Sequence, residues 1–220
     1  MSPQLDAFLA AEDLDELLNA RQNISALDAE DAGIVRSVLH QWQNPQAVSN
    51  LLLHPTLIPD DARLQALLQG LSERKVAYYV LAAVVGLQGI NAADLANADR
   101  ERLVVDLLAL IRDTNGILAQ RASVSFQGLA NEADVPQVFG LMGHADNTVQ
   151  HNLRAWLFRT FQGRGVEPFA AAAAKSGLAE DVKRRVVGEF TEFVMNPPQG
   201  FKSPVYSLFG YIPNLREVQK

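Results

Sequence analysis

Apolar residues recur along most of the chain at the spacing of an α-helix. The four leucines of segment 64–71 stand at positions i, i+3, i+4 and i+7, which places their side chains on one helical face. The same spacing recurs in segments 34–42, 76–87 and 135–142. No segment alternates clearly between apolar and polar residues, and no Asn-Gly or Asp-Gly turn separates β-rich runs. The pattern therefore predicts an all-α protein.

Proline and glycine residues mark where the predicted helices begin and end. Five prolines stand in first helical turns, where the missing N–H of proline is tolerated. Gly177 is predicted to end a helix in the left-handed conformation, and Asn196-Pro197-Pro198 ends the last helix. We predict helices over residues 3–10, 12–20, 28–42, 46–53, 59–71, 75–89, 99–112, 115–130, 134–143, 147–162, 166–176 and 179–195.

The predicted helix over residues 75–89 differs from the others because it is apolar on nearly all of its faces. One face carries Val80 and Val84, and the remaining faces carry further apolar residues such as Leu81 and Val85. A helix that is apolar all round is usually buried. We therefore expect this helix to lie at the centre of the fold.

The predicted helices form pairs from residue 28 onward, and the pairs recur at intervals of about 29 to 40 residues. First helices begin near residues 28, 59, 99, 134 and 166, and second helices begin near 46, 75, 115, 147 and 179. An offset of 33 residues aligns Asp113, Arg121 and Ala122 with Asp146, Arg154 and Ala155. Such a period is typical of helical repeat arrays.

This rhythm resembles that of HEAT and armadillo-type α-solenoids over residues 28–195. Segment 146–161 is the most similar to the second half of such a repeat. The family often has Asp and Arg closer together than the eight-residue gap between Asp146 and Arg154. The resemblance implies a solenoid of about five helical hairpins with an extended curved face. The alternative, a closed bundle, would need a strong apolar stripe on every helix.

The two ends of the chain differ from the repeat pattern, although we interpret residues 1–220 as one domain. Residues 1–27 carry a narrow leucine stripe followed by polar residues, which predicts an N-terminal helical cap. The tail, residues 196–220, places four aromatic residues within the eleven positions 201–211. Disordered tails are poor in aromatic residues, so we expect this tail to pack against the last helices. The alternatives are a docking segment and a dimer contact.

Composition and charge limit the classes of function. The chain is 48% apolar and contains no cysteine, which excludes disulfides, zinc–thiolate sites and a thiol nucleophile. Residues 1–110 carry 15 acidic and 7 basic side chains, whereas residues 111–220 carry 10 acidic and 12 basic ones. An acidic chain makes nucleic acid an unlikely partner. Neither a membrane span nor a basic secretory signal is present, so we predict a cytoplasmic protein.

The sequence indicates no catalytic centre. The four histidines, at positions 40, 54, 144 and 151, lack the i, i+4 spacing of a metal site. No phosphate-binding glycine loop and no Gly-x-Ser-x-Gly nucleophile motif occurs. The pairs Asp60-Asp61 and Glu180-Asp181 open predicted helices, where they complement the helix dipole. We therefore predict no catalytic residue, no cofactor and no metal, and favour a non-enzymatic protein.

The candidate binding residues are arginines in the C-terminal half. Arg121, Arg154 and Arg185 stand six or seven residues into three successive second helices, and Arg159 lies nearby. If second helices line the concave face, these four form a row that binds an acidic or phosphorylated partner. The alternative interpretation is that they tie adjacent repeats together or are simply solvated.

The leading functional hypothesis is an interaction module or scaffold that binds another protein on its extended helical face. The alternative is an enzyme similar to small HEAT-like DNA glycosylases, which the chain resembles in length, helix count and the fragment 119–127. Such enzymes need a basic groove and aromatic residues around the extruded base. Here Trp42 and Trp156 stand at core-like positions. HEAT-like lyases acting on a chromophore are a third alternative, without a nucleophile or cofactor signature. The oligomeric state stays open.

Overall fold

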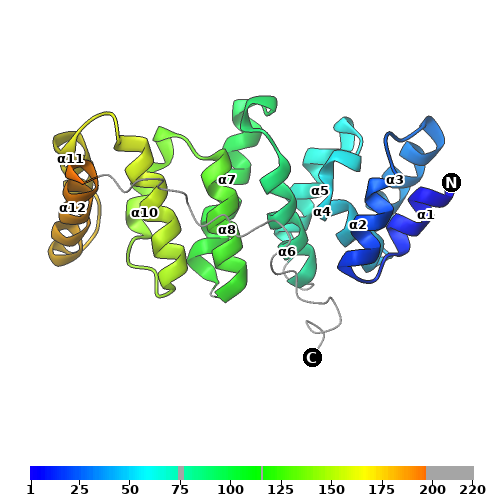
Figure 1. Cartoon of the computed structure of the whole chain (residues 1–220), viewed down its shortest axis with the longest axis horizontal. Helices are drawn as coiled ribbons and strands as arrows, with labels where there is room; N and C mark the ends of the chain where they lie inside the picture. Colours follow the sequence, from blue (N-terminus) through cyan, green and yellow to red (C-terminus); the bar gives the residue numbers. More distant parts are fainter. Residues whose placement is uncertain (74–76, 115, 197–220) are drawn as a thin grey trace. The chain divides into compact units, whose positions relative to one another are not determined.

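The helical periodicity of the sequence is present throughout the computed structural model, which describes residues 1–73, 77–114 and 116–196 (Figure 1). Within these ranges there is no β-strand, and the all-α prediction is confirmed. The described α-helices are α1 (Pro3–Ala10), α2 (Leu14–Gln22), α3 (Ala29–Gln41), α4 (Pro45–Leu53), α5 (Asp60–Ser72), α6 (Ala77–Gly86), α7 (Asn97–Asp113), α8 (Gly116–Leu129), α9 (Val135–Gly140), α10 (Asn147–Phe161), α11 (Val166–Ala174) and α12 (Glu180–Met195). Four 3₁₀ turns accompany them: η1 (Pro55–Leu57), η2 (Leu87–Gly89), η3 (Ala92–Asp94) and η4 (Glu132–Asp134).

The chain divides into two compact units, which are described separately. The first comprises the described residues up to Leu103, and the second comprises those from Val104 to residue 196. The boundary falls inside α7. The predicted packing of the tail lies outside the described residues. No described helix has the length and apolar character needed to cross a membrane.

In the first unit, consecutive helices pack in pairs and the second members of the pairs pack on each other. Helix α3 packs on α4, α5 packs on α6, and α4 packs on α6. Helix α1 packs on both α2 and α4. The predicted burial of α6 is confirmed, because Tyr79, Val80 and residues 82–85 are at most 6% exposed.

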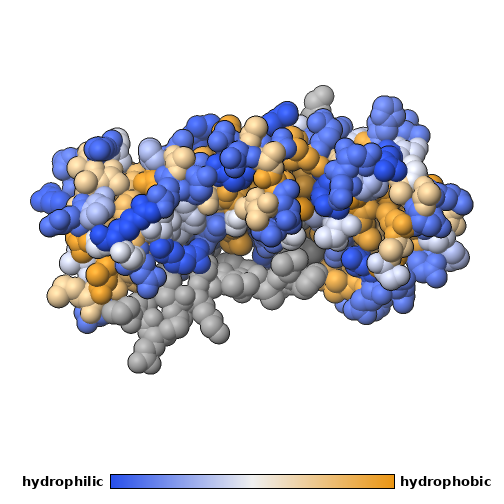
Figure 2. Space-filling model, turned by 90° about the horizontal axis from the view of Figure 1, so that it is seen from above, coloured by the Kyte–Doolittle hydropathy of each residue, from blue (hydrophilic) through white to orange (hydrophobic). Residues whose placement is uncertain are grey.

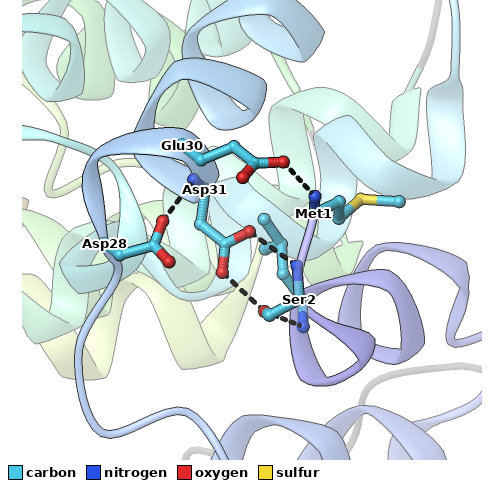
Figure 3. Close-up of polar contacts among 6 residues, drawn as sticks. Met1, Ser2, Asp28, Glu30 and Asp31 are labelled. Atoms are coloured by element: carbon cyan, nitrogen blue, oxygen red, sulfur yellow. Dashed lines mark hydrogen bonds and ion pairs between the residues drawn. The ribbon is translucent and has the colours of Figure 1, made fainter.

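A network of hydrogen bonds holds the residues at the start of α1 against the first turn of α3 (Figure 3). Asp31, a buried residue in the first turn of α3, accepts hydrogen bonds from the backbone N–H of Ser2 at 2.8 Å and from its hydroxyl at 2.5 Å. The Ser2 hydroxyl also accepts from the N–H of Leu5 and caps α1, and Asp28 caps α3 at the N–H of Asp31. The bonds from Ser2 hold the pKa of Asp31 below its ordinary value.

Asn50 of α4 binds the C-terminal end of α1. Its side-chain Nδ2 donates to the carbonyl oxygens of Phe8 and Ala11, at 2.9 Å and 3.0 Å. Its Oδ1 accepts from Gln46 Nε2 at 3.1 Å. The last carbonyls of a helix have no partner within the helix, so this buried amide satisfies groups that would otherwise be desolvated without a hydrogen bond.

The second unit also packs helices against one another in pairs, and it has an aromatic core. Helix α8 packs on α10, and α11 packs on α12. Phe169 and Phe190 stack with ring centroids 4.1 Å apart, and Phe158 contacts both rings edge-on. Trp156 lies edge-on to Phe126 with centroids 5.3 Å apart and is 5% exposed, in agreement with its core-like position.

Several helix ends differ from the predicted bounds, and at two of them the residue that ends the helix was not anticipated. The expected left-handed cap at Gly177 is wrong, because among the described residues only Gly116, Gly165 and Trp42 have positive φ. Helix α11 ends at Ala174, and just beyond it the N–H and the hydroxyl of Ser176 both donate to the Ala173 carbonyl. Trp42 ends α3 at φ 50°, and its ring lies edge-on to Tyr79 with centroids 5.0 Å apart.

Candidate functional site

On the face of the molecule shown in Figure 2, hydrophilic side chains are interspersed with hydrophobic patches. The large hydrophobic side chains that are exposed within the described ranges are Met1, Val105 and Met195. They are far apart in the sequence: Met1 precedes α1, Val105 lies on α7 and Met195 ends α12. The candidate sites therefore depend on charged groups and on clefts between helices.

The predicted arginines occupy different environments in the second unit. Arg121, on α8, is 5% exposed, so its side chain is enclosed rather than presented to solvent. Arg154, on α10, forms an ion pair with Glu189 of α12, with Nη1 2.8 Å from Oε2. The pair is partly buried and connects two second helices. At Arg154 this contact joins α10 to α12.

The other two predicted arginines reach solvent. Arg159, in the last turn of α10, donates a hydrogen bond from Nη2 to Gln127 Oε1 of α8. Arg185 is exposed on α12, next to the exposed Arg184. The structure thus brings Arg159 and Arg185 to the surface of one unit, whereas Arg121 is buried and Arg154 is paired. Their role in partner binding stays a prediction.

A ladder of hydrogen bonds connects α8 with α10 and was not anticipated from the sequence. Gln120 Nε2 donates to Asp146 Oδ2 at 2.9 Å, and Asp146 also caps α10 at two backbone N–H groups. Buried Asn152 donates to the Ser123 hydroxyl at 2.9 Å. Amide and hydroxyl side chains have no periodic signature in a sequence, so only the alignment of the two helices reveals their pairing.

Two of the four histidines, His54 and His144, make contacts that support local structure. In the segment before α10, His144 Nδ1 accepts from the Asp146 N–H at 3.0 Å, and its Nε2 lies 3.3 Å from the Thr114 carbonyl. His54, at the end of α4, packs edge-on to Phe8. Burial, together with the nearby Arg21 charge, lowers the pKa of His54 to about 4. Among the described residues, no three potential metal-ligating side chains gather.

The first unit contains a cleft of about 560 Å³, which we call the η3 cleft. It lies between the start of α5, the η2–η3 segment and the start of α7. Its lining residues are Thr56, Asp60, Arg63, Leu64, Leu67, Gly89, Ile90, Asn91, Asp94, Leu95, Ala96, Asp99 and Leu103. The cleft therefore combines an apolar floor, mainly of leucines, with three carboxylates and one arginine.

Arg63, the arginine of the η3 cleft, already has hydrogen-bond and ion-pair partners within the first unit. Arg63 Nε donates to the Pro55 carbonyl at 2.8 Å, and Nη2 donates to the Ile58 carbonyl at 2.9 Å. Its Nη2 also lies 2.7 Å from Asp60 Oδ1. By contrast, Asp94 and Asp99 have no hydrogen bond or ion pair through their carboxylates to any described residue. The cleft is therefore acidic.

A second groove of about 740 Å³ lies between α3 and α5 and carries balanced charge. Arg36 crosses it with two bonds to Asp61, Nε–Oδ2 at 3.1 Å and Nη2–Oδ1 at 3.0 Å. The Arg36 guanidinium accordingly lowers the pKa of Asp61. Because its charges neutralise each other, this groove is a weaker candidate than the η3 cleft.

Comparison with protein-family models, with curated protein sequences and with solved structures gave no match. No local pattern in the sequence indicates the η3 cleft, although Asp60 stands where it complements the α5 dipole. The three carboxylates come from three separate segments, and only the fold brings them to one place.

Proposed function

We propose that this chain is a non-catalytic helical-repeat module, of the HEAT-like solenoid type, that binds another protein through its helical surface. One observation carries the proposal: in each unit, helices that follow in sequence pack in pairs, and second helices pack on each other, α4 on α6 and α8 on α10. In repeat arrays this arrangement buries one continuous seam and leaves the outer faces available to a partner. The proposal keeps the cytoplasmic location that the sequence predicts.

The two exposed arginines supply one face of the proposed module. Arg159 and Arg185 are proposed to contact an acidic or phosphorylated region of the partner, because guanidinium groups pair well with carboxylates and phosphates. Arg121 is not included in this face because it is buried. Arg154 is not included because Glu189 already pairs with it.

The test is capture from an extract of the native cells, followed by titration with the captured protein after purification. We expect saturable binding at a fixed stoichiometry. The double variant Arg159→Glu/Arg185→Glu should weaken it, whereas the matched variant Arg112→Glu/Lys175→Glu, which changes exposed cations elsewhere in the same unit, should not.

Two results would contradict the proposal. One is the absence of any protein that binds saturably. The other is binding of nucleic acid with a steep dependence on salt concentration, which would favour the glycosylase-type alternative. Unchanged binding by Arg159→Glu/Arg185→Glu would show that these two arginines do not contact the partner, and it would leave the rest of the proposal standing.

A further inference from the structure

We propose that the η3 cleft binds a basic segment of a partner protein, in which a lysine or arginine is flanked by apolar side chains. This inference rests on the proposed function, because it names the chemistry of the partner at one place on the module. The three requirements of such a site are an apolar floor, uncompensated negative charge and a suitable size.

The floor of the cleft can bury apolar side chains. Leu67 and Leu103 are almost fully buried and form its base, while Leu64, Ile90 and Leu95 are partly exposed. Each partly exposed side chain retains apolar surface in contact with water. Covering that surface with a leucine or with the aliphatic part of a lysine is favourable because apolar area leaves water.

The charge of the cleft selects a cation. Asp60, Asp94 and Asp99 line it, and Arg63 offsets one of them. Asp60 is the first residue of α5, and Asp99 lies in the first turn of α7, so two helix N-termini face the same region. Each contributes roughly half a positive charge. About one unit of negative charge remains, and it belongs to carboxylates that no described residue neutralises.

The size of the cleft fits a short peptide segment rather than a folded domain. Its volume of about 560 Å³ lies within the range of roughly 300–1,000 Å³ that accommodates compact ligands. Asp94 is exposed at the rim and Asp99 is partly exposed, so a cation can reach them from solvent. A basic side chain can therefore lie at the rim while its apolar neighbours occupy the floor.

The experiment uses the full chain and two labelled peptides of equal length. One alternates leucine with lysine, and the other alternates leucine with glutamate. Fluorescence anisotropy gives the Kd, and amide shift changes in the NMR spectrum locate the binding site. We expect the lysine peptide to bind with a Kd below about 1 mM, with shift changes centred on Ile90, Leu95 and Asp99. The glutamate peptide should bind at least tenfold more weakly.

Two charge variants separate the cleft from the general acidity of the unit. Asp94→Lys/Asp99→Lys should weaken binding of the lysine peptide by at least tenfold. Asp6→Lys/Asp15→Lys changes the net charge equally in the same unit, at exposed positions outside the cleft, and should change binding less than threefold. The milder Asp94→Asn/Asp99→Asn variant provides the same comparison if the charge reversal perturbs folding.

Four results would overturn this proposal: equal binding of both peptides, preference for the glutamate peptide, no binding of the lysine peptide, or equal loss in both charge-reversed variants. Preference for the glutamate peptide would instead assign the cleft to the helix N-termini as an anion site. A purified protein partner whose binding survives Asp94→Lys/Asp99→Lys would contradict the cleft proposal and leave the proposed function standing. Peptide binding in the cleft, together with the absence of any protein partner, would contradict the proposed function and leave the cleft proposal standing.

Discussion

Gly86 of α6 lies directly against the carbonyl oxygen of Leu52 in α4: a Cβ atom added at Gly86 would lie 1.9 Å from that oxygen. The two helices therefore approach each other backbone to backbone. Gly70 of α5 makes a similar contact, because a Cβ there would lie 2.9 Å from Ala83 Cβ and 3.0 Å from Leu52 Cδ1. Three helices of the first unit thus meet around Leu52.

We expect Gly86→Ala to destabilise the protein by at least about 2 kcal/mol, because the α4 backbone must move to admit the methyl group. Gly33→Ala is the matched control. Gly33 is also helical, but a Cβ there meets no described atom within 4 Å, so alanine should stabilise the helix by up to about 1 kcal/mol. Urea denaturation of both variants measures the difference. Equal stability of the two variants would show that α4 and α6 do not pack this closely.

Replacing Asn50 should loosen α1. In Asn50→Leu the Phe8 and Ala11 carbonyls lose their donor while they stay enclosed, which costs about 2–3 kcal/mol. The neighbouring Ser49 is equally buried, but its hydroxyl has no hydrogen-bond partner among the described residues. Ser49→Ala should therefore be neutral or slightly stabilising. Hydrogen exchange should show faster opening of α1 in the Asn50 variant alone, and protection equal to that of the parent would contradict the assignment.

His54 should make stability depend on pH between about 4 and 6.5. The unfolded chain takes up a proton at His54 near pH 6.5, whereas the folded chain does so only near its pKa of about 4. The folded state therefore has its full stability from neutral His54 above pH 6.5. This stability declines as the pH falls toward 4, by an amount on the order of 2–3 kcal/mol.

The measurement is urea denaturation at several pH values for the parent and for His54→Gln. The difference in the free energy of unfolding between them should shrink or change sign as the pH falls from 6.5 to 4. His40→Gln replaces an exposed histidine and should follow the parent. A constant difference between the parent and His54→Gln would exclude a depressed His54 pKa.

The Arg154–Glu189 pair should show a small coupling energy. The pair is partly exposed, and we expect about 0.5–1 kcal/mol from a double-mutant cycle. Arg154→Glu places two carboxylates together and should destabilise the protein, and the exchange Arg154→Glu/Glu189→Arg should restore part of the loss. Without any restoration, the two side chains do not interact in solution.

The sequence predicts the helices well because the signals that define them are local. The prediction for α1, residues 3–10, matches its bounds, since Pro3 and the apolar spacing mark it directly. Helix 75–89 is correctly expected to be buried but is continued after Gly86 by a 3₁₀ turn. The prediction at Gly177 is wrong because the Ser176 hydroxyl already donates a hydrogen bond to the Ala173 carbonyl at the end of α11. Residue type alone does not reveal which neighbour donates that hydrogen bond.

The candidate sites are harder to predict because they depend on contacts between distant segments. The near-equal spacing of Arg121, Arg154 and Arg185 favours one row of binding residues, yet Arg121 is enclosed while Arg185 is exposed. A displacement of one residue in helical register turns a side chain by about 100°. The η3 cleft needs Asp60 beside Asp94 and Asp99, which no local pattern specifies.

The position of the unit boundary inside α7 has a consequence for how the protein loses its structure. A continuous helix cannot melt on one side of Leu103 without removing hydrogen bonds from the first turns on the other side, so thermal denaturation should be cooperative across both units. The two tryptophans offer a natural readout, because Trp42 belongs to the first unit and Trp156 to the second. Fluorescence melting curves of Trp42→Phe and Trp156→Phe should then coincide, although the first variant reports on Trp156 in the second unit and the second variant reports on Trp42 in the first unit.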